Sequence, residues 1–134
     1  MGPRHLVRIR RRPHFVRAAQ QGRKQFSKGL ILQVRSRTQD EDGQTPADAI
    51  RVGFTVTRKV GKAVVRNRIR RRLKAVAEEV LARHAKPGHD YVLIGRIDTK
   101  LRPFPELLSD LAQALRKTGA WIDNNTIGKY GDLY

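Results

Sequence analysis

The sequence contains no cysteine among its 134 residues. Neither a disulfide nor a thiolate metal site is therefore available, which fits a reducing compartment. The sequence also has no apolar run long enough to span a bilayer, and its amino terminus is too rich in arginine for a secretory signal. We therefore expect a cytoplasmic protein. The length suits one domain with its own core, so we expect residues 1–134 to form a single domain.

Acidic residues are scarce in the first half of the chain. Residues 1–74 hold 21 Lys and Arg against four acids, whereas residues 75–134 hold eight of each, so the formal net charge of +17 lies entirely in the first half. A generally solvated basic surface would spread its charge more evenly along the chain. The asymmetry therefore favours a polyanion as the partner of the first half.

The sequence also has few groups suited to catalysis. A two-metal nuclease needs several carboxylates that converge on one site, but the acids of the basic half all lie in the segment 40–48. A histidine mechanism needs a histidine paired with an orienting group, and the four histidines are scattered at termini and helix ends. There is no Walker-type glycine loop and no zinc-ligand spacing. We therefore assign no catalytic residue and no metal ligand to this chain.

What the sequence does contain is a concentration of positive charge on an amphipathic helical pattern, beginning in the stretch 59–74. Apolar residues recur on one side of a helix that we expect to run to about Lys86: Ile69, Leu73, Val76, Ala77, Val80 and Leu81. Basic residues flank this stripe through the first two turns, and no acid offsets them before Glu78. Because like charges repel along a helix, we expect an anionic partner, with a polyphosphate backbone as the obvious candidate.

Hydrophobic periodicity predicts an α+β fold, a two-layer sandwich of one small sheet with helices packed on it. The predicted order is helix, strand, strand, strand, helix, strand, helix, preceded by a mobile basic arm and followed by a tail of unknown role. In chain order the segments are 1–12 for the arm, 13–22 for the first helix, a short strand near Phe26, strands over 30–35 and 50–57, the basic helix, a strand buried on both faces over 90–96, a helix from Pro103 to just before Gly119, and the tail 120–134.

The strands over 30–35 and 50–57 alternate in polarity, so each has one face turned to the core. The outward face of the second carries Gly53 and Thr55, which either leaves room for another backbone to approach or marks a bulge. The polar segment 40–48 between them predicts an exposed hairpin loop whose acids form a solvated tip.

The run from Arg51 to Leu73, RVGFTVTRKVGKAVVRNRIRRRL, resembles the signature of the protein component of bacterial ribonuclease P. The specific part is Arg66-Asn67-Arg68 preceded by Gly-x-Ala-Val, and the likeness extends from Pro13 to about Trp121. The resemblance implies a ribosomal-protein-like α+β sandwich with a left-handed crossover through the basic helix. It also implies that the partner is a catalytic RNA which, with Mg²⁺ as cofactor, removes the 5′ leader of precursor tRNA. The protein would be a cofactor of this endoribonuclease, not its catalyst.

The resemblance implies two sets of RNA-binding residues. Those expected to meet the catalytic RNA, and to help place metal ions near the cleavage site, are Arg66, Asn67, Arg68, Arg70 and Arg71, with Arg58, Lys59, Lys62 and Lys74 as further RNA-binding residues. Those expected to line a cleft for the single-stranded leader, between the first helix and the outer face of the sheet, are Phe15, Ala19, Ile31, Gln33, Arg51 and Thr55. Ala19 stands where family members often have a second aromatic residue, and Gln33 where some have tyrosine, so leader stacking is expected to rest on Phe15.

Other classes of protein share some of these features. A ribosomal or general structured-RNA-binding protein would have the same charge and basic arm, but the Arg-Asn-Arg signature argues against it. A duplex-DNA reader would need a recognition helix that projects base-reading side chains, whereas this helix is arginine nearly all round. Binding to an anionic membrane would need exposed bulky apolar residues, which we expect the sheet to cover.

Overall fold

The structure is a computed structural model, and it describes residues 4–37 and 45–123. The strands are β1 (Leu6–Arg8), β2 (Arg23–Phe26), β3 (Leu30–Ser36), β4 (Ile50–Thr55) and β5 (His89–Gly95), and the helices are α1 (Arg12–Gln21), α2 (Ala63–His84) and α3 (Phe104–Lys117). Two 3-10 turns, Arg58–Val60 and Ile97–Lys100, precede α2 and α3 respectively. From α1 onward this order is the predicted one, so the α+β class and the short strand near Phe26 are confirmed.

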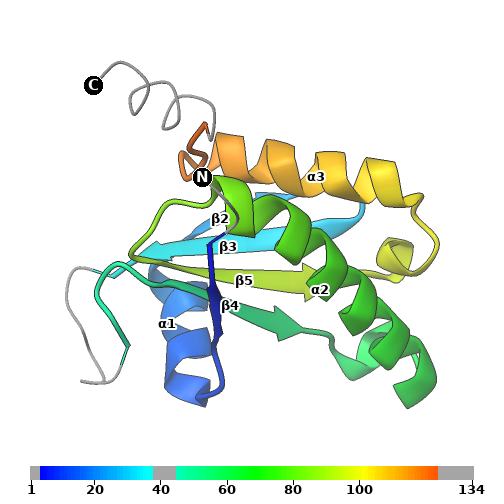
Figure 1. Ribbon diagram of the computed structural model, residues 1–134. Helices are drawn as coiled ribbons and strands as arrows, with labels where there is room; N and C mark the ends of the chain where they lie inside the picture. The colour runs from blue at the N-terminus through cyan, green and yellow to red at the C-terminus, as the bar shows by residue number, and fades with distance from the viewer. Residues whose placement is uncertain (1–3, 38–44, 124–134) are drawn as a thin grey trace.

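The strands form one five-stranded sheet in the order β1-β4-β5-β3-β2 (Figure 1). β5 lies between β3, to which it is antiparallel, and β4, to which it is parallel. The prediction of a hairpin between β3 and β4 is therefore wrong, because β5 is inserted between them. Central placement explains why β5 is apolar on both faces, as its continuous hydrophobic run predicted.

Helices cover both faces of the sheet. α2 and α3 lie side by side on one face, and α1 lies on the opposite face (Figure 1). The predicted apolar stripe of α2 is confirmed, since Ile69, Leu73 and Leu81 are fully buried against the sheet and α3. On the other face a small cluster forms around Ala18 of α1. Each face of the sheet is thus packed against at least one helix.

The prediction that residues 1–12 form a mobile arm is wrong for the residues that the structure describes. Leu6 to Arg8 form β1, an edge strand parallel to β4. Ile9 continues this pairing with a hydrogen bond from its N–H to the Val52 carbonyl (2.9 Å), and its side chain is buried beside α1. A strand of three residues is too short to leave a periodic signal in the sequence, and it forms because the edge of β4 offers unpaired backbone groups.

Some predicted features fall outside the described residues. These are the first three residues of the arm, residues 38–44 with the acidic loop tip, and residues 124–134 of the tail. The beginning of the tail does pack on the fold, because the Trp121 ring stacks on the His84 ring with 3.9 Å between centroids. No helix in the described part of the chain is long and apolar enough to cross a membrane.

Candidate RNA interface

The candidate interface begins at the turn that leads into α2. Residues 58–60 form a 3-10 turn, and Gly61 follows with a φ of 153°, a backbone conformation that residues with a side chain rarely adopt. α2 then starts after Lys62, whose side chain makes no capping hydrogen bond. The turn leaves Arg58, Lys59 and Lys62 exposed together at the amino end of the helix.

The first half of α2 carries positive charge on every side except its buried stripe. Its first turn holds no acidic residue, and basic side chains near a helix amino terminus oppose the helix dipole as well as one another. Four of the predicted RNA-binding residues on the helix are exposed and two are half-buried: Asn67, Arg68, Arg71 and Lys74, then Arg66 and Arg70. A bound anion would relieve both kinds of repulsion.

Hydrogen bonds orient some of the side chains on the basic half of α2. The Asn67 side-chain oxygen accepts a hydrogen bond from a terminal guanidinium nitrogen of Arg70 (3.2 Å). The Nε atoms of Arg66 and Arg72 are both buried without a hydrogen-bond partner among the described residues. A terminal guanidinium nitrogen of Arg72 donates to the carbonyl of Arg102 and so ties α2 to the start of α3.

The predicted leader cleft is largely filled by packing of α1 on the sheet. The Phe15 ring lies over Gly53, where an added Cβ would come within 2.5 Å of a ring carbon. Neither alternative for Gly53 holds, because an aromatic side chain occupies the space and the β4–β5 ladder runs through Gly53 without a bulge. Phe15, Ile31 and Thr55 are half-buried and Ala19 is exposed, so these four remain at the accessible rim. Gln33 is only 5% exposed and does not line an open cleft.

Arg51, also predicted to line the cleft, is buried in an ion cluster around Asp90. Its Nε and one terminal nitrogen donate to the two Asp90 carboxylate oxygens at 2.7 and 2.8 Å. Arg37 and Arg35 donate to the same carboxylate at 2.8 and 3.3 Å. Burial alone would raise the pKa of Asp90, but the hydrogen bonds and charges of Arg51 and Arg37 outweigh it and hold that pKa below its ordinary value. Arg51 therefore joins β4 to β5 and is unavailable to a leader in this structure.

A surface hollow of about 420 Å³ connects the two predicted sets at the end of β4. Phe15 and Thr55 of the cleft set and Arg70 of the helix set all line it. Sequence reasoning missed the two basic residues Arg10 and Arg12 of its lining, because it treated residues 1–12 as a free arm. The hollow places an aromatic ring and several guanidinium groups around one opening, the arrangement that binds single-stranded nucleic acid.

A second hollow, of about 320 Å³, lies on the other flank of α2. Arg68, Arg71 and Phe104 line it, and Phe104 is 38% exposed. Phe104 is not among the site residues predicted from the sequence. The signal in the sequence was an aromatic residue that lies between two prolines and two positions after Arg102.

Comparison with known proteins decides the family. Residues 4–119 match the family model described as ribonuclease P. The chain belongs to the ribonuclease P protein family. Among curated ribonuclease P protein components, that of Ruegeria pomeroyi is 49% identical over 113 residues, which cover 84% of this chain and 86% of that protein. That of Paramagnetospirillum magneticum is 46% identical over 115 residues, which cover 86% and 84%.

Solved ribonuclease P proteins share the fold. The Staphylococcus aureus protein superposes with a TM-score of 0.69 at 20% identity, over 87% of this chain and 98% of that one. The Thermotoga maritima protein gives a TM-score of 0.65 at 23% identity, over 82% and 96%. Membership of the ribonuclease P family associates this chain with tRNA processing by a ribonucleoprotein.

Proposed function

We propose that this chain binds the catalytic RNA of ribonuclease P together with the single-stranded 5′ leader of precursor tRNA, and so promotes Mg²⁺-dependent removal of the leader. The observation that carries the proposal is the meeting of two surfaces at the end of β4. There the uncompensated basic half of α2 adjoins a hollow lined by Phe15, Thr55 and Arg70. A surface of this kind suits two RNA strands that must be held next to each other.

The exposed basic residues of α2 and its preceding turn are assigned to the catalytic RNA. Their guanidinium and ammonium groups neutralise phosphates and release counterions, which gives affinity without sequence specificity. The hollow at the end of β4 is assigned to the leader, with Phe15 as a stacking platform worth roughly 1–3 kcal/mol for one base. We assign no contact with the leader to Arg51 and Gln33, because both side chains are buried.

Mg²⁺ is the cofactor that we expect of the complex of this protein with RNA. Within residues 4–37 and 45–123, no three His, Asp or Glu side chains come together at a point where they could hold a metal ion. Mg²⁺ prefers oxygen ligands and keeps much of its water shell. Phosphate oxygens of the RNA supply such ligands, and the basic residues of the protein would position these phosphates.

The test is cleavage of a precursor tRNA by a bacterial ribonuclease P RNA at low Mg²⁺, with and without this protein. Strong stimulation with correct 5′ ends is expected. Binding without stimulation would replace the proposal with a general structured-RNA-binding role. Cleavage by the protein alone would overturn the assignment of catalysis to the RNA.

A further inference from the structure

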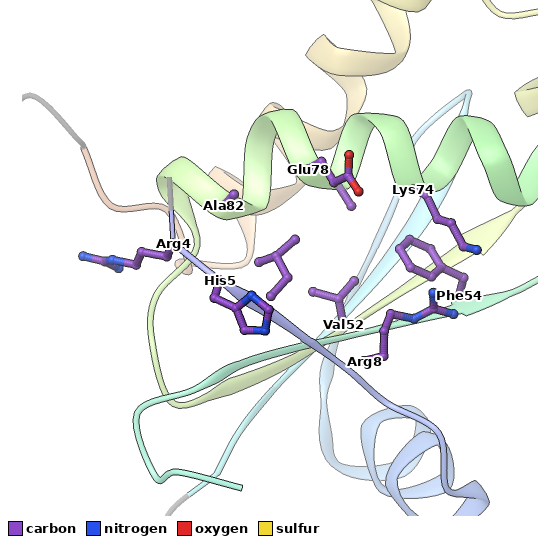
Figure 2. A pocket seen from close by; sticks show the side chains of 10 residues that line it. Arg4, His5, Arg8, Val52, Phe54, Lys74, Glu78 and Ala82 are labelled. Carbon is purple, nitrogen blue, oxygen red and sulfur yellow. The ribbon is translucent and has the colours of Figure 1, made fainter. Parts of the chain in front are cut away.

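A groove of about 500 Å³ lies between β1 and α2, on the face of the sheet opposite α1 (Figure 2). Its floor is apolar: Leu6 of β1 and Phe54 of β4 are half-buried there, above the buried Val52 and Ala77. Its rim carries Arg8 of β1 and Lys74 of α2. The groove exists because β1 extends the sheet beyond the part that α2 covers.

The register of β1 directs the Arg8 side chain into this groove. Arg8 pairs with Val52 in the parallel ladder, and residues directly opposite each other in a sheet point to the same face. The Arg8 guanidinium lies 4.8 Å from the centroid of the Phe54 ring, and Lys74 lines the groove from α2 (Figure 2). Arg4 lies at the far end of the groove, where its backbone N–H donates to the Ala82 carbonyl at 2.7 Å and so holds the chain against α2.

The groove and the hollow at the end of β4 adjoin at Phe54. Phe54 lines both, and along α2 the hollow is lined by Arg70 and the groove by Lys74, one turn later. The pairing of β1 with β4 ends at Val52, so β1 does not cover the backbone edge of β4 beyond that residue. A strand in the hollow would pass Phe54 to reach the groove.

We propose that the groove binds nucleotides of the leader distal to those held at the end of β4, an inference that rests on the proposed function. One phosphate lies between Arg8 and Lys74, and its base lies against the apolar floor. The volume falls within the range of small-ligand sites, about 300–1,000 Å³, which admits a nucleotide but not a duplex. The leader is the occupant we expect, because the groove adjoins, at Phe54, the hollow assigned to the leader.

Glu78 fixes the orientation of the bound nucleotide. It lines the groove one turn beyond Lys74, so its carboxylate repels a phosphate at that end and accepts hydrogen bonds from base amino groups. The phosphate therefore lies at the Arg8 end of the groove. Replacement of Glu78 should have the opposite effect from replacement of the two basic residues, which distinguishes direct contact with RNA from a general effect on folding.

The experiment measures affinity of the reconstituted holoenzyme for precursor tRNAs with leaders of increasing length. The double variant Arg8→Gln/Lys74→Gln should lose roughly tenfold in affinity for long leaders, with a salt slope lower by about 0.7 for each lost phosphate contact. Affinity for short leaders should stay unchanged. Glu78→Gln should bind long leaders more tightly than the wild type. The matched control is Arg83→Gln/Lys117→Gln, which removes the same charge from exposed positions outside the groove.

The outcomes separate the two proposals. If the wild type neither binds nor stimulates the catalytic RNA, the proposed function fails. If the wild type stimulates cleavage but the Arg8/Lys74 variant binds long leaders normally, only the groove fails. An equal loss for short and long leaders would also overturn the groove as a leader site.

A second measurement avoids any effect of these variants on folding. Because the chain has no cysteine, Glu78→Cys supplies a unique thiol in the groove for a photo-crosslinker. Crosslinks to distal leader nucleotides are expected from position 78, but not from Glu79→Cys at the next exposed position of α2, which does not line the groove. Crosslinks from position 78 to the catalytic RNA instead of the leader would overturn the proposal.

Discussion

At the scale of single residues, Asp90 matters most for stability. It is fully buried and accepts hydrogen bonds from Arg35, Arg37 and Arg51. Asp90→Asn removes the negative charge and leaves three buried guanidinium groups around a neutral amide, which should cost about 3–5 kcal/mol in the free energy of unfolding. Chemical denaturation of both proteins at neutral pH measures the loss. Asp48→Asn, at an exposed position, is the control and should change stability by less than about 0.5 kcal/mol.

The same carboxylate predicts a dependence of stability on pH. Its pKa in the folded state lies below the ordinary value of 3.8, so its contribution is complete above that value and is lost as the pH falls through the folded pKa. The difference in unfolding free energy between wild type and Asp90→Asn should therefore narrow in acid. A difference that stayed constant down to the acid transition would contradict the assignment of the effect to the Asp90 charge.

Gly53 controls the position of the Phe15 ring. In Gly53→Ala the new Cβ would overlap the ring, so the ring must move, and we expect affinity for leader-bearing precursor tRNA to fall while affinity for the catalytic RNA alone is kept. A stacked base contributes roughly 1–3 kcal/mol, which sets the largest loss. Binding of precursor tRNAs with and without a leader is the measurement. Phe15→Ala is the companion variant, and different leader dependence in the two variants would contradict the link between them.

Sequence reasoning identified which residues are charged or aromatic, but not which of them are accessible. Arg51 lies on the outward face of β4, as the alternation predicted, yet Asp90 on the neighbouring β5 draws it into a buried cluster. An acid at the start of an otherwise apolar strand was the available signal. The partners of Asp90 could not be predicted from the sequence, because tertiary packing decides the strand order that brings Arg51 and Asp90 side by side.

At the scale of elements, α2 separates into a basic half and a structural half. Arg66→Ala or Arg68→Ala should lower affinity for the catalytic RNA and reduce the salt slope of binding by about 0.7–0.9 for each lost phosphate contact. Neither side chain belongs to the core, so thermal unfolding should stay near that of the wild type. Arg83→Ala, exposed near the other end of the same helix, is the matched control. An unchanged slope for both basic-half variants would mean that this half of α2 faces solvent in the complex.

The helices were predictable from sequence to within a few residues, whereas the edges of the sheet were not. The 22 residues of α2 provide six turns of periodicity and a Pro-Gly stop shortly after its end. β1 has three residues, too few for any pattern, and its strand character comes from the edge of β4 that it covers. This matters for function, because the same pairing that turns the predicted arm into a strand also creates the groove beside α2.

At the scale of the whole molecule, the net charge of +17 makes the folded chain repel itself, and a bound polyanion should stabilise it. A single-stranded RNA oligomer at a hundredfold excess over its Kd adds about 2.7 kcal/mol to the unfolding free energy, a rise in Tm on the order of 10 °C for a domain of this size. An uncharged methylphosphonate oligomer of the same sequence is the matched control and should stabilise far less. Added salt should reduce the stabilisation by RNA, because the release of counterions from the RNA contributes less to binding at higher salt concentration. Equal stabilisation by the two oligomers would mean that bases rather than phosphates dominate the interaction, and would contradict an interface built on the basic half of the chain.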